Sequence, residues 1–301
     1  MTLPRIGFIG FGEAARCFAR HFADLGVPEM TVFCDGATNR PPYTPGFTAL
    51  VREHGAATVD SVTDLGARCD VIFSAVVVAA AAPAGAAIAA VLRPGTLVVD
   101  INATTPSGKK GVAAAVTARG GAFVDANLMG SAELYGAKVP LYCSGDGAAR
   151  FAALFAPLGL NIEQAGPVPG DAAAVKMLRS VVTKGMEALL VEAMVAASRA
   201  GVRAEALHGI CAPMDATSFS RFADMCIRTD VLHAERRAVE MEGVADGLRE
   251  FGVDPVMTMA TAARLRASAA LGLRTRFAAK VGYTADDVLD AYVAETAAGA
   301  A

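Results

Sequence analysis

The chain has 301 residues, of which 54% are hydrophobic and 19% are charged, and its formal net charge is −3. This length favours two domains of ~150 residues each, and the apolar content is enough for sizeable cores. Because no basic stretch stands out, the composition excludes nucleic acid as the expected partner. The apolar run over residues 71–91 is mostly alanine and contains Pro83 and Gly85. It therefore predicts a strand, a turn and a helix rather than a membrane span.

The six cysteines are scattered along the chain without the C-x-x-C spacing of a structural zinc site: Cys17, Cys34, Cys69, Cys143, Cys211 and Cys226. The same scatter gives no disulfide framework, so we expect a reducing, cytoplasmic location and no bound metal. The N-terminus lacks the layout of a signal peptide, because Arg5 interrupts its apolar residues.

The first predicted element is a short buried strand, Ile6 to Ile9, which a glycine turn and a helical pattern follow. The turn has the spacing G-x-G-x-x-A at Gly10, Gly12 and Ala15. Gly10 permits the tight turn, Gly12 lets a pyrophosphate approach the backbone, and Ala15 lets the helix pack against the strand. The helix N-terminus offers N–H groups to the phosphates. A strand before the motif and a helix after it predict a dinucleotide site, with these binding residues: Gly10, Phe11, Gly12, Glu13 and Ala14. The alternative is a βα turn that is merely rich in glycine.

The second predicted strand, residues 30–34, ends at Asp35. A carboxylate at this place can meet the hydroxyls of the adenosine ribose. Asn39 and Arg40 follow closely and could instead hold a 2′-phosphate, and Asp35 could also be only a turn residue before Gly36. We therefore expect NAD or NADP as the cofactor, with a preference for NAD because a carboxylate repels a 2′-phosphate.

Further predicted strands alternate with helical patterns: residues 71–78, 96–100, 121–125, 139–143 and 160–163. Such alternation predicts an α/β fold with a doubly wound parallel sheet of the Rossmann type. The strand at residues 71–78 should end under the nicotinamide, which adds Val76 to the cofactor-binding residues. Beyond residue 165 only helical patterns remain. We expect an NAD(P)-binding domain over residues 1–164 and an all-helical substrate and dimerisation domain over residues 165–301.

A long helix is predicted over residues 171–199. One face of it carries a polar stripe: Lys176, Ser180, Thr183, Lys184 and Glu187. Polar stripes often face solvent, but the remaining faces are nearly all apolar, which predicts a largely buried helix. A lysine on a buried helix needs a partner or a function. Lys176 facing a cofactor cleft can act as a general acid or base, and Ser180 can bind the substrate or orient Lys176.

The order of four features resembles the β-hydroxyacid dehydrogenases, the group of 3-hydroxyisobutyrate and 6-phosphogluconate dehydrogenases. These features are the G-x-G-x-x-A turn, a D-x-x-x-x-x-P turn at Asp100–Pro106, a D-A-x-x-x-G segment at Asp125–Gly130, and the helix with Lys176. The resemblance covers nearly the whole chain and is strongest over residues 1–200. The stretch from His233 to Val253 resembles the branch with a phosphogluconate-dehydrogenase-like C-terminal domain.

The resemblance implies that Lys176 is the proton donor or acceptor opposite the nicotinamide. The family asparagine one helical turn later corresponds to Ser180, and the family's substrate-binding serine corresponds to Asn102, with Thr104 nearby. We count Asn102 as a catalytic and cofactor-contacting candidate. The family S-G-G segment binds a substrate carboxylate through backbone N–H groups, and here it reads Met129, Gly130 and Ser131. These substitutions leave the redox class intact and put the usual small 3-hydroxyacids in doubt.

We therefore expect an NAD(P)-dependent dehydrogenase or reductase. It would transfer a hydride at the hydroxyl-bearing carbon of a small carboxylate-containing compound, with Lys176 as the general acid or base. Decarboxylation after oxidation stays open. The alternatives are an imine reductase on the same fold and a non-catalytic, dinucleotide-binding regulatory protein. The expected partners are a small-molecule substrate and a second copy of the chain in a homodimer, without nucleic acid or membrane. No role is assigned to His208, His233, Arg236 or Arg237.

Overall fold

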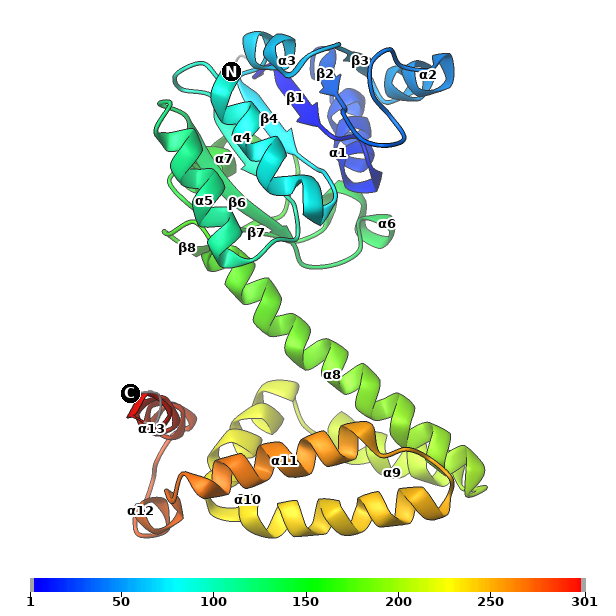
Figure 1. Ribbon diagram of the computed structural model, residues 1–301, viewed down its shortest axis with the longest axis vertical. Helices are drawn as coiled ribbons and strands as arrows, with labels where there is room; N and C mark the ends of the chain where they lie inside the picture. Colours follow the sequence, from blue (N-terminus) through cyan, green and yellow to red (C-terminus); the bar gives the residue numbers. More distant parts are fainter. Residues whose placement is uncertain (1–2, 299–301) are drawn as a thin grey trace. The chain divides into compact units, whose positions relative to one another are not determined.

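The computed structural model describes residues 3–298, which form two compact units that divide after Val181. The first unit holds a sheet with helices on both faces, and the second unit is all helical (Figure 1). The expected α/β fold followed by an all-helical region is confirmed. The division between the compact units lies inside helix α8 (Asp171–Arg199). The functional boundary expected at residue 164 stays a prediction.

The sheet has eight strands: β1 Ile6–Ile9, β2 Met30–Phe33, β3 Ala56–Thr58, β4 Val71–Ser74, β5 Leu97–Asp100, β6 Ala122–Leu128, β7 Leu141–Ser144 and β8 Ile162–Gly166. Their order across the sheet is β3-β2-β1-β4-β5-β6-β7-β8. The first six follow the order of dinucleotide-binding sheets, in which the strand order reverses between β1 and β4.

All neighbouring strands run parallel except β6 and β7, which are antiparallel and pair Asp125 with Ser144. The sheet is thus mostly parallel, as the expected doubly wound fold predicts, with one antiparallel pair among the described strands. Between β6 and β7 the chain forms only the four-residue helix α6 (Ala132–Tyr135) and a single 3₁₀ turn, Gly136–Lys138. A parallel return normally needs a longer crossover helix, so the chain turns back directly alongside β6.

Two hydrophobic cores lie on the two faces of the sheet. One core joins the strands to α1 (Glu13–Asp24), α2 (Pro45–Glu53) and α7 (Ala148–Phe155). The other joins them to α3 (Val62–Arg68), α4 (Ala81–Val91) and α5 (Pro106–Thr117). Successive strand residues alternate between these cores, so Phe73 of β4 packs with the first group and Ile72 with the second. Figure 1 shows α4 and α5 together on one face of the sheet.

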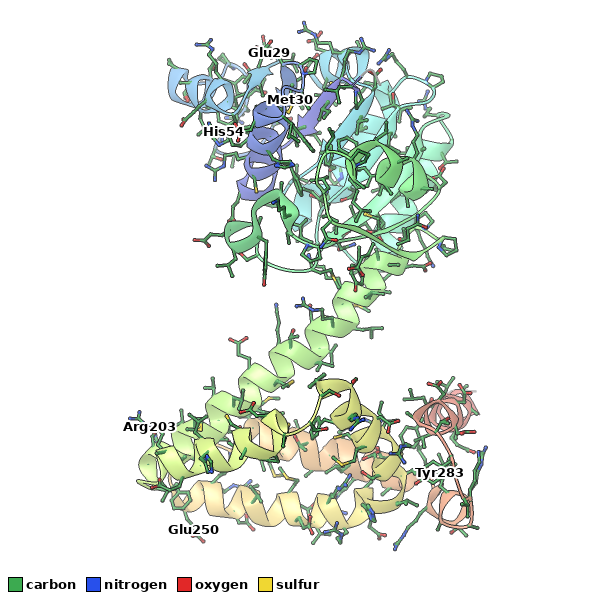
Figure 2. All side chains as sticks on the ribbon, turned by 180° about the vertical axis from the view of Figure 1, so that it is seen from behind. Glu29, Met30, His54, Arg203, Glu250 and Tyr283 are labelled. Atoms are coloured by element: carbon green, nitrogen blue, oxygen red, sulfur yellow. The ribbon has the colours of Figure 1, made fainter. Side chains whose placement is uncertain are left out.

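The second unit consists of the end of α8 and five further helices: α9 Arg203–Asp215, α10 Phe219–Glu250, α11 Val256–Ala270, α12 Arg274–Ala278 and α13 Ala285–Ala298. Glu192 of α8 binds the N-terminus of α11, because its carboxylate accepts the backbone N–H groups of Met257 and Thr258 at 2.7 and 2.9 Å. Tyr283, labelled in Figure 2, donates its hydroxyl to the carbonyl of Arg228 at 3.1 Å. The unit therefore has its own polar contacts, and it also has its own buried apolar cluster around Phe277 and Val288.

The long helix has the predicted bounds, but its apolar side chains are far more exposed than expected. The exposed positions are Met177, Leu178, Val181, Val182, Met186, Leu189, Leu190, Val191 and Val195. Apolar residues on every face of a helix indicate burial, but the pattern does not say which chain supplies the covering surface. The expectation of a largely buried α8 is therefore not met in the single chain. Across the described residues, no helix combines the length and the apolar character that crossing a membrane would require.

Candidate active site

The glycine turn between β1 and α1 has the geometry that its sequence predicts. Gly10 has φ +83°, and a β-carbon there would collide with the carbonyl oxygen of Ala75. Gly12 precedes α1 in extended conformation, and a β-carbon there would meet nothing within 4 Å. Among the described residues, no side chain caps the first N–H groups of α1. The turn therefore fits a pyrophosphate, with open space in front of a positive helix end. Glu13 and Ala14 form the start of this helix, whereas the Phe11 ring packs against Phe47 and His54.

The end of β2 carries the two residues expected to select the cofactor. Asp35 and Arg40 are both exposed on the loop that follows this strand. Tyr43 anchors the loop, because its hydroxyl accepts the N–H of Cys34 at 2.9 Å and lies 3.0 Å from the Cys34 carbonyl. Burial raises the pKa of the Tyr43 hydroxyl to about 12, so it stays a neutral donor and acceptor. The structure thus fixes the residue before Asp35.

Asn102 bridges the ends of two neighbouring strands. Its side-chain oxygen accepts the N–H of Val76 at 2.7 Å, and its Nδ2 donates to the hydroxyl of Ser74 at 2.9 Å. The Asn102 backbone N–H donates to Asp100 Oδ1 at 2.8 Å. Asn102 is only 3% exposed and does not line the pocket described next. The geometry gives it a supporting contact beneath Val76, and its expected contact with the substrate stays a prediction.

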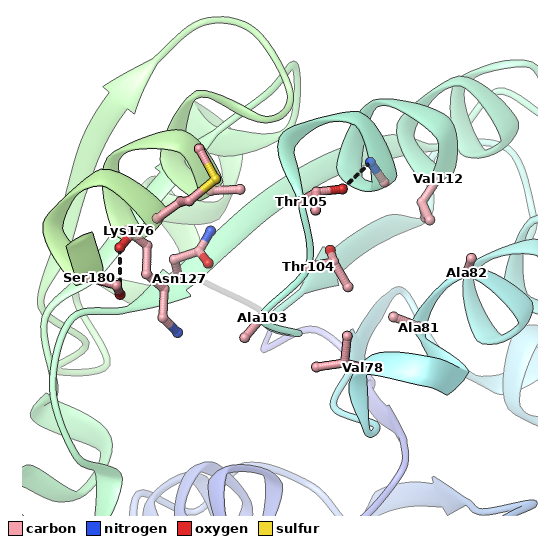
Figure 3. A pocket seen from close by; sticks show the side chains of 13 residues that line it. Val78, Ala81, Ala82, Ala103, Thr104, Thr105, Val112, Asn127, Lys176 and Ser180 are labelled. Carbon is pink, nitrogen blue, oxygen red and sulfur yellow. Dashed lines mark hydrogen bonds between the residues drawn. The ribbon is translucent and has the colours of Figure 1, made fainter. Parts of the chain in front are cut away.

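A pocket of about 470 Å³ lies within the first unit, beyond the carboxyl ends of β4, β5 and β6. Ligands of such sheets bind at this edge. Its lining includes Val78, Ala81, Ala103, Thr104, Asn127, Lys176 and Ser180. Figure 3 shows Asn127, Lys176 and Ser180 on the side opposite Val78, Ala81 and Ala82. One wall is therefore polar and the facing wall is made of small apolar residues.

Lys176 lines this pocket from the second turn of α8, and its side chain is half-buried. Ser180 lines the pocket one helical turn later, and its hydroxyl donates to the carbonyl of Lys176 at 2.9 Å. Thr104 is also in the lining, beside the N-terminus of α5, where Thr105 accepts the N–H of Gly108 at 3.2 Å. The structure thus brings together three of the predicted catalytic and substrate-binding residues.

The predicted carboxylate-binding segment does not reach the pocket lining. Met129 donates its N–H to the carbonyl of Pro140 at 2.8 Å, and the hydroxyl of Ser131 accepts the N–H of Glu133 at 3.1 Å. A β-carbon at Gly130 would lie 3.2 Å from the ring of Tyr135. These groups serve the connection between β6 and β7, so a substrate contact from Met129, Gly130 or Ser131 stays a prediction.

A buried charged cluster lies behind the polar wall, formed by Lys109, Asp100 and Asp125. Lys109 is fully buried on α5, and its Nζ lies 3.1 Å from Asp100 Oδ1 and 3.2 Å from Asp125 Oδ1. The same Nζ donates to the carbonyl of Asp100 at 2.7 Å. A buried charge requires this kind of pairing. The cluster therefore joins α5 to the end of β5 and to the middle of β6.

Asp125 continues this cluster into the first turn of α8. Its Oδ2 accepts the N–H groups of Gly170 and Ala173 at 3.1 and 2.9 Å. Ser144 donates its hydroxyl to the same oxygen at 3.2 Å and accepts the N–H of Ala172 at 3.1 Å. Two side chains of the sheet thus satisfy the N–H groups that a helix leaves unpaired at its start.

Sequence reasoning missed Lys109, Asn127, Ser144 and Tyr43. Lys109 precedes Val112, Ala113 and Val116 at helical spacing, so its place on the buried face of α5 was readable. Asn127 follows Asp125 by two residues on β6, which places both side chains on one face of the strand. Ser144 gave no comparable signal, because its partners come from β6 and α8.

The histidines and arginines without an assigned role lie in the second unit. His208 and His233 are both exposed. Arg236 pairs with Glu240, and Arg237 donates to the hydroxyl of Thr229 at 3.0 Å. The pocket lining includes none of these four residues.

Two families match the chain, one for each part of the fold. Residues 5–153 match the NAD binding domain of 6-phosphogluconate dehydrogenase. Residues 197–268 match a domain of unknown function, DUF1932. The first unit therefore has the NAD(P)-binding fold of dehydrogenases and reductases, in agreement with the glycine turn and the strand order.

Solved structures extend the likeness over nearly the whole chain. A conserved hypothetical protein from Sinorhizobium meliloti is 30% identical over 98% of this chain and 97% of its own, with a TM-score of 0.63. The conserved protein MTH1747, whose structure is described as similar to 3-hydroxyacid dehydrogenases, is 33% identical over 88% of this chain and 97% of its own, with a TM-score of 0.61. An imine reductase from Aspergillus terreus in complex with NADPH4 and dibenz[c,e]azepine is 18% identical over 90% of this chain and 95% of its own, with a TM-score of 0.73. At that identity the likeness shows the fold alone.

The open space at Gly12 yields a test of the dinucleotide site. Gly12→Val is expected to abolish binding of NADH and NADPH in calorimetric titration, because the side chain would fill the space before α1. The free energy of unfolding should fall by less than about 1 kcal/mol, since the side chain meets no atoms and only a weak cap position changes. Gly10→Ala is the contrast, and positive φ together with the Ala75 carbonyl should destabilise it by about 1–3 kcal/mol. Binding by Gly12→Val as tight as that of the parent would contradict this placement.

Proposed function

Because the chain belongs to the β-hydroxyacid dehydrogenase family, in the branch that carries this C-terminal domain, we propose that it is an NAD(P)-dependent oxidoreductase acting on a hydroxyl-bearing carbon. The substrate would be a small carboxylate-containing hydroxy compound. The observation that carries the proposal is the position of Lys176. It lines a pocket at the same edge of the sheet as the glycine turn.

The residues of the first unit fit a dinucleotide. The backbone from Gly10 to Ala14 would hold the pyrophosphate, Asp35 the adenosine ribose, and Val76 the nicotinamide side. When bound, the nicotinamide group accepts or supplies a hydride. We propose a preference for NAD, because the carboxylate of Asp35 repels a 2′-phosphate, although the nearby Arg40 would attract one. Tighter binding of NADPH than of NADH by the parent protein in the titration above would contradict this preference.

Lys176 would handle the proton of the reaction. In the oxidative direction its neutral amine takes the hydroxyl proton as the C–O bond becomes a carbonyl. In the reductive direction its ammonium returns that proton to the carbonyl oxygen. A positioned acid or base of this kind contributes about 10²–10⁴ in rate. Ser180 would hold the backbone carbonyl of Lys176 and, after rotation of its hydroxyl, can reach the substrate.

The carboxylate of the substrate would bind at the start of α5. Thr104 and Gly108 line the pocket there, and a helix N-terminus attracts an anion. Asn127 supplies a further polar group from the side of Lys176. Met129, Gly130 and Ser131 lie outside the lining, so we propose the start of α5 as an alternative to the carboxylate site that the family resemblance implies.

Reduction of a C=N bond is the second candidate. The wall opposite Lys176 consists of Val78, Ala81 and Ala82, which suits an apolar cyclic imine as well as a hydroxyacid carbon chain. A screen of 3-hydroxyacids with NAD⁺ or NADP⁺ against cyclic imines with NADH or NADPH separates the two. Turnover of imines alone would replace the first proposal by the second.

Lys176→Ala should lower kcat about 10²–10⁴-fold on the best substrate of that screen, because the general acid or base is lost. The dissociation constant for NADH should stay within twofold. Lys110→Ala is the matched control, since Lys110 is exposed on α5 and does not line the pocket. A Lys176→Ala variant whose turnover stays within tenfold of the parent would sink the mechanism.

We propose a homodimer in which the exposed apolar residues of α8 are covered by a second copy of the chain. Nine large apolar side chains of α8 are at least 40% exposed in the single chain, and a surface of this kind marks an interface. Sedimentation equilibrium should give twice the chain mass. Leu190→Arg should shift the protein toward the monomer, while Val281→Asp, at a residue 97% exposed in the second unit, should leave the mass unchanged. A monomeric parent protein would refute the dimer.

A further inference from the structure

We propose that Lys109 is a positioning residue, which holds the first turn of α8 in place and thereby sets where Lys176 enters the pocket. The inference rests on the proposed function for the catalytic role of Lys176. Lys109 itself lies outside the pocket lining and is fully buried. It would act only through the groups that it contacts.

The first step is the short path from the cluster to the pocket. Ala173 donates its N–H to Asp125, and Ala173 also lines the pocket. Lys176 follows three residues later, which places it on the same face of α8. A shift of the first turn of the helix therefore moves Lys176 with it.

The second step is that the two carboxylate oxygens of Asp125 bind different partners. Oδ2 accepts the backbone of α8 and the hydroxyl of Ser144, whereas Oδ1 lies at 3.2 Å from Lys109 Nζ and accepts Asn127 Nδ2 at 2.7 Å. Asn127 is itself part of the polar wall. Lys109 thus fixes the carboxylate that orients both a helix and a pocket side chain.

The third step is the close approach of α5 and α8 at their N-termini. Gly170 has φ +99°, and a β-carbon there would lie 2.8 Å from the carbonyl oxygen of Pro106. Lys109 is in the first turn of α5, three residues after Pro106. Both α5 and α8 border the pocket. The ammonium of Lys109 on α5 therefore connects these two walls of the pocket through Asp125, which binds the start of α8.

A role in stability alone would not require a charge at this position. Buried ion pairs are often no more stabilising than apolar side chains of similar volume, so packing alone does not explain a buried lysine. The two carboxylates explain it, because Asp125 holds α8 and Asp100 holds the backbone of Asn102. Because both buried carboxylates are needed for these contacts, the positive charge of Lys109 is needed to compensate them.

The test compares Lys109→Met and Ser144→Ala with Val116→Ala. Ser144→Ala removes one contact of the same turn and keeps every charge, so it serves if Lys109→Met fails to fold. Val116 is fully buried on the same helix, away from the pocket lining, and controls for lost packing. Hydrogen–deuterium exchange of the amides of residues 172–176 is measured on the free protein. The values of kcat and KM are measured with the best substrate and cofactor of the screen above.

We expect Ser144→Ala, and Lys109→Met where it folds, to speed exchange of these amides at least tenfold and to lower kcat at least tenfold. The KM for the cofactor should stay within twofold, because the glycine turn is untouched. Val116→Ala should change neither readout by more than twofold. Equal effects of Val116→Ala and Ser144→Ala, or faster exchange without loss of kcat, would overturn the proposal. If Lys176→Ala keeps its turnover, the proposed function fails. The exchange measurement does not depend on that function, so unchanged exchange at residues 172–176 would overturn the positioning role of the cluster separately.

Discussion

The arrangement of the site depends on one buried ammonium group between two carboxylates. Taking Lys109, Asp100 and Asp125 out of water carries a large desolvation cost, which their mutual contacts must offset. Removing one partner of such a cluster costs about 3–5 kcal/mol, because a buried charge is left without compensation. The cluster therefore tolerates only small changes in geometry. A fixed geometry of the cluster also fixes the start of α8, since Asp125 accepts the N–H groups there. We therefore infer that the position of the catalytic candidate Lys176 depends on the contacts of Asp125 with the start of α8.

The parallel sheet supplies the second constraint, because it brings the carboxyl ends of its strands to one edge. The glycine turn follows β1, Asp35 follows β2, and Val76 follows β4. The pocket lies beyond β4, β5 and β6 at the same edge. Asn102 connects the two regions, since its amide holds Val76 while its backbone is held by Asp100. The candidate dinucleotide site and the pocket therefore share supporting contacts through Asn102.

Much of the fold and part of the candidate site were predictable from local sequence patterns. The remaining features depend on contacts between residues that are distant in the sequence. Gly10 and Gly12 identify the turn because only backbone geometry is involved, and the bounds of α8 follow from its spacing. The strand at β7 was predicted, but its antiparallel direction was not, because strand direction depends on the length of the connection. The burial of Lys109 was visible in the pattern of α5, whereas its partners on β5 and β6 were not. The exposure of α8 could not be predicted, since an apolar helix pattern is the same whichever chain covers it.

Under the proposed function, this chain differs from the family at the positions that the resemblance assigns to substrate binding. The turn that holds the cofactor and the lysine on α8 are both kept. The residues that the resemblance assigns to the substrate are changed to Asn102 and Ser180, and the segment at Met129 serves the chain itself. Each changed side chain already has a partner within the protein. A substrate would then be bound by the polar groups of the lining, Thr104, Asn127 and Ser180, beside an apolar wall of small residues. Under this proposal we expect the redox class of the family together with a substrate other than the usual small 3-hydroxyacids.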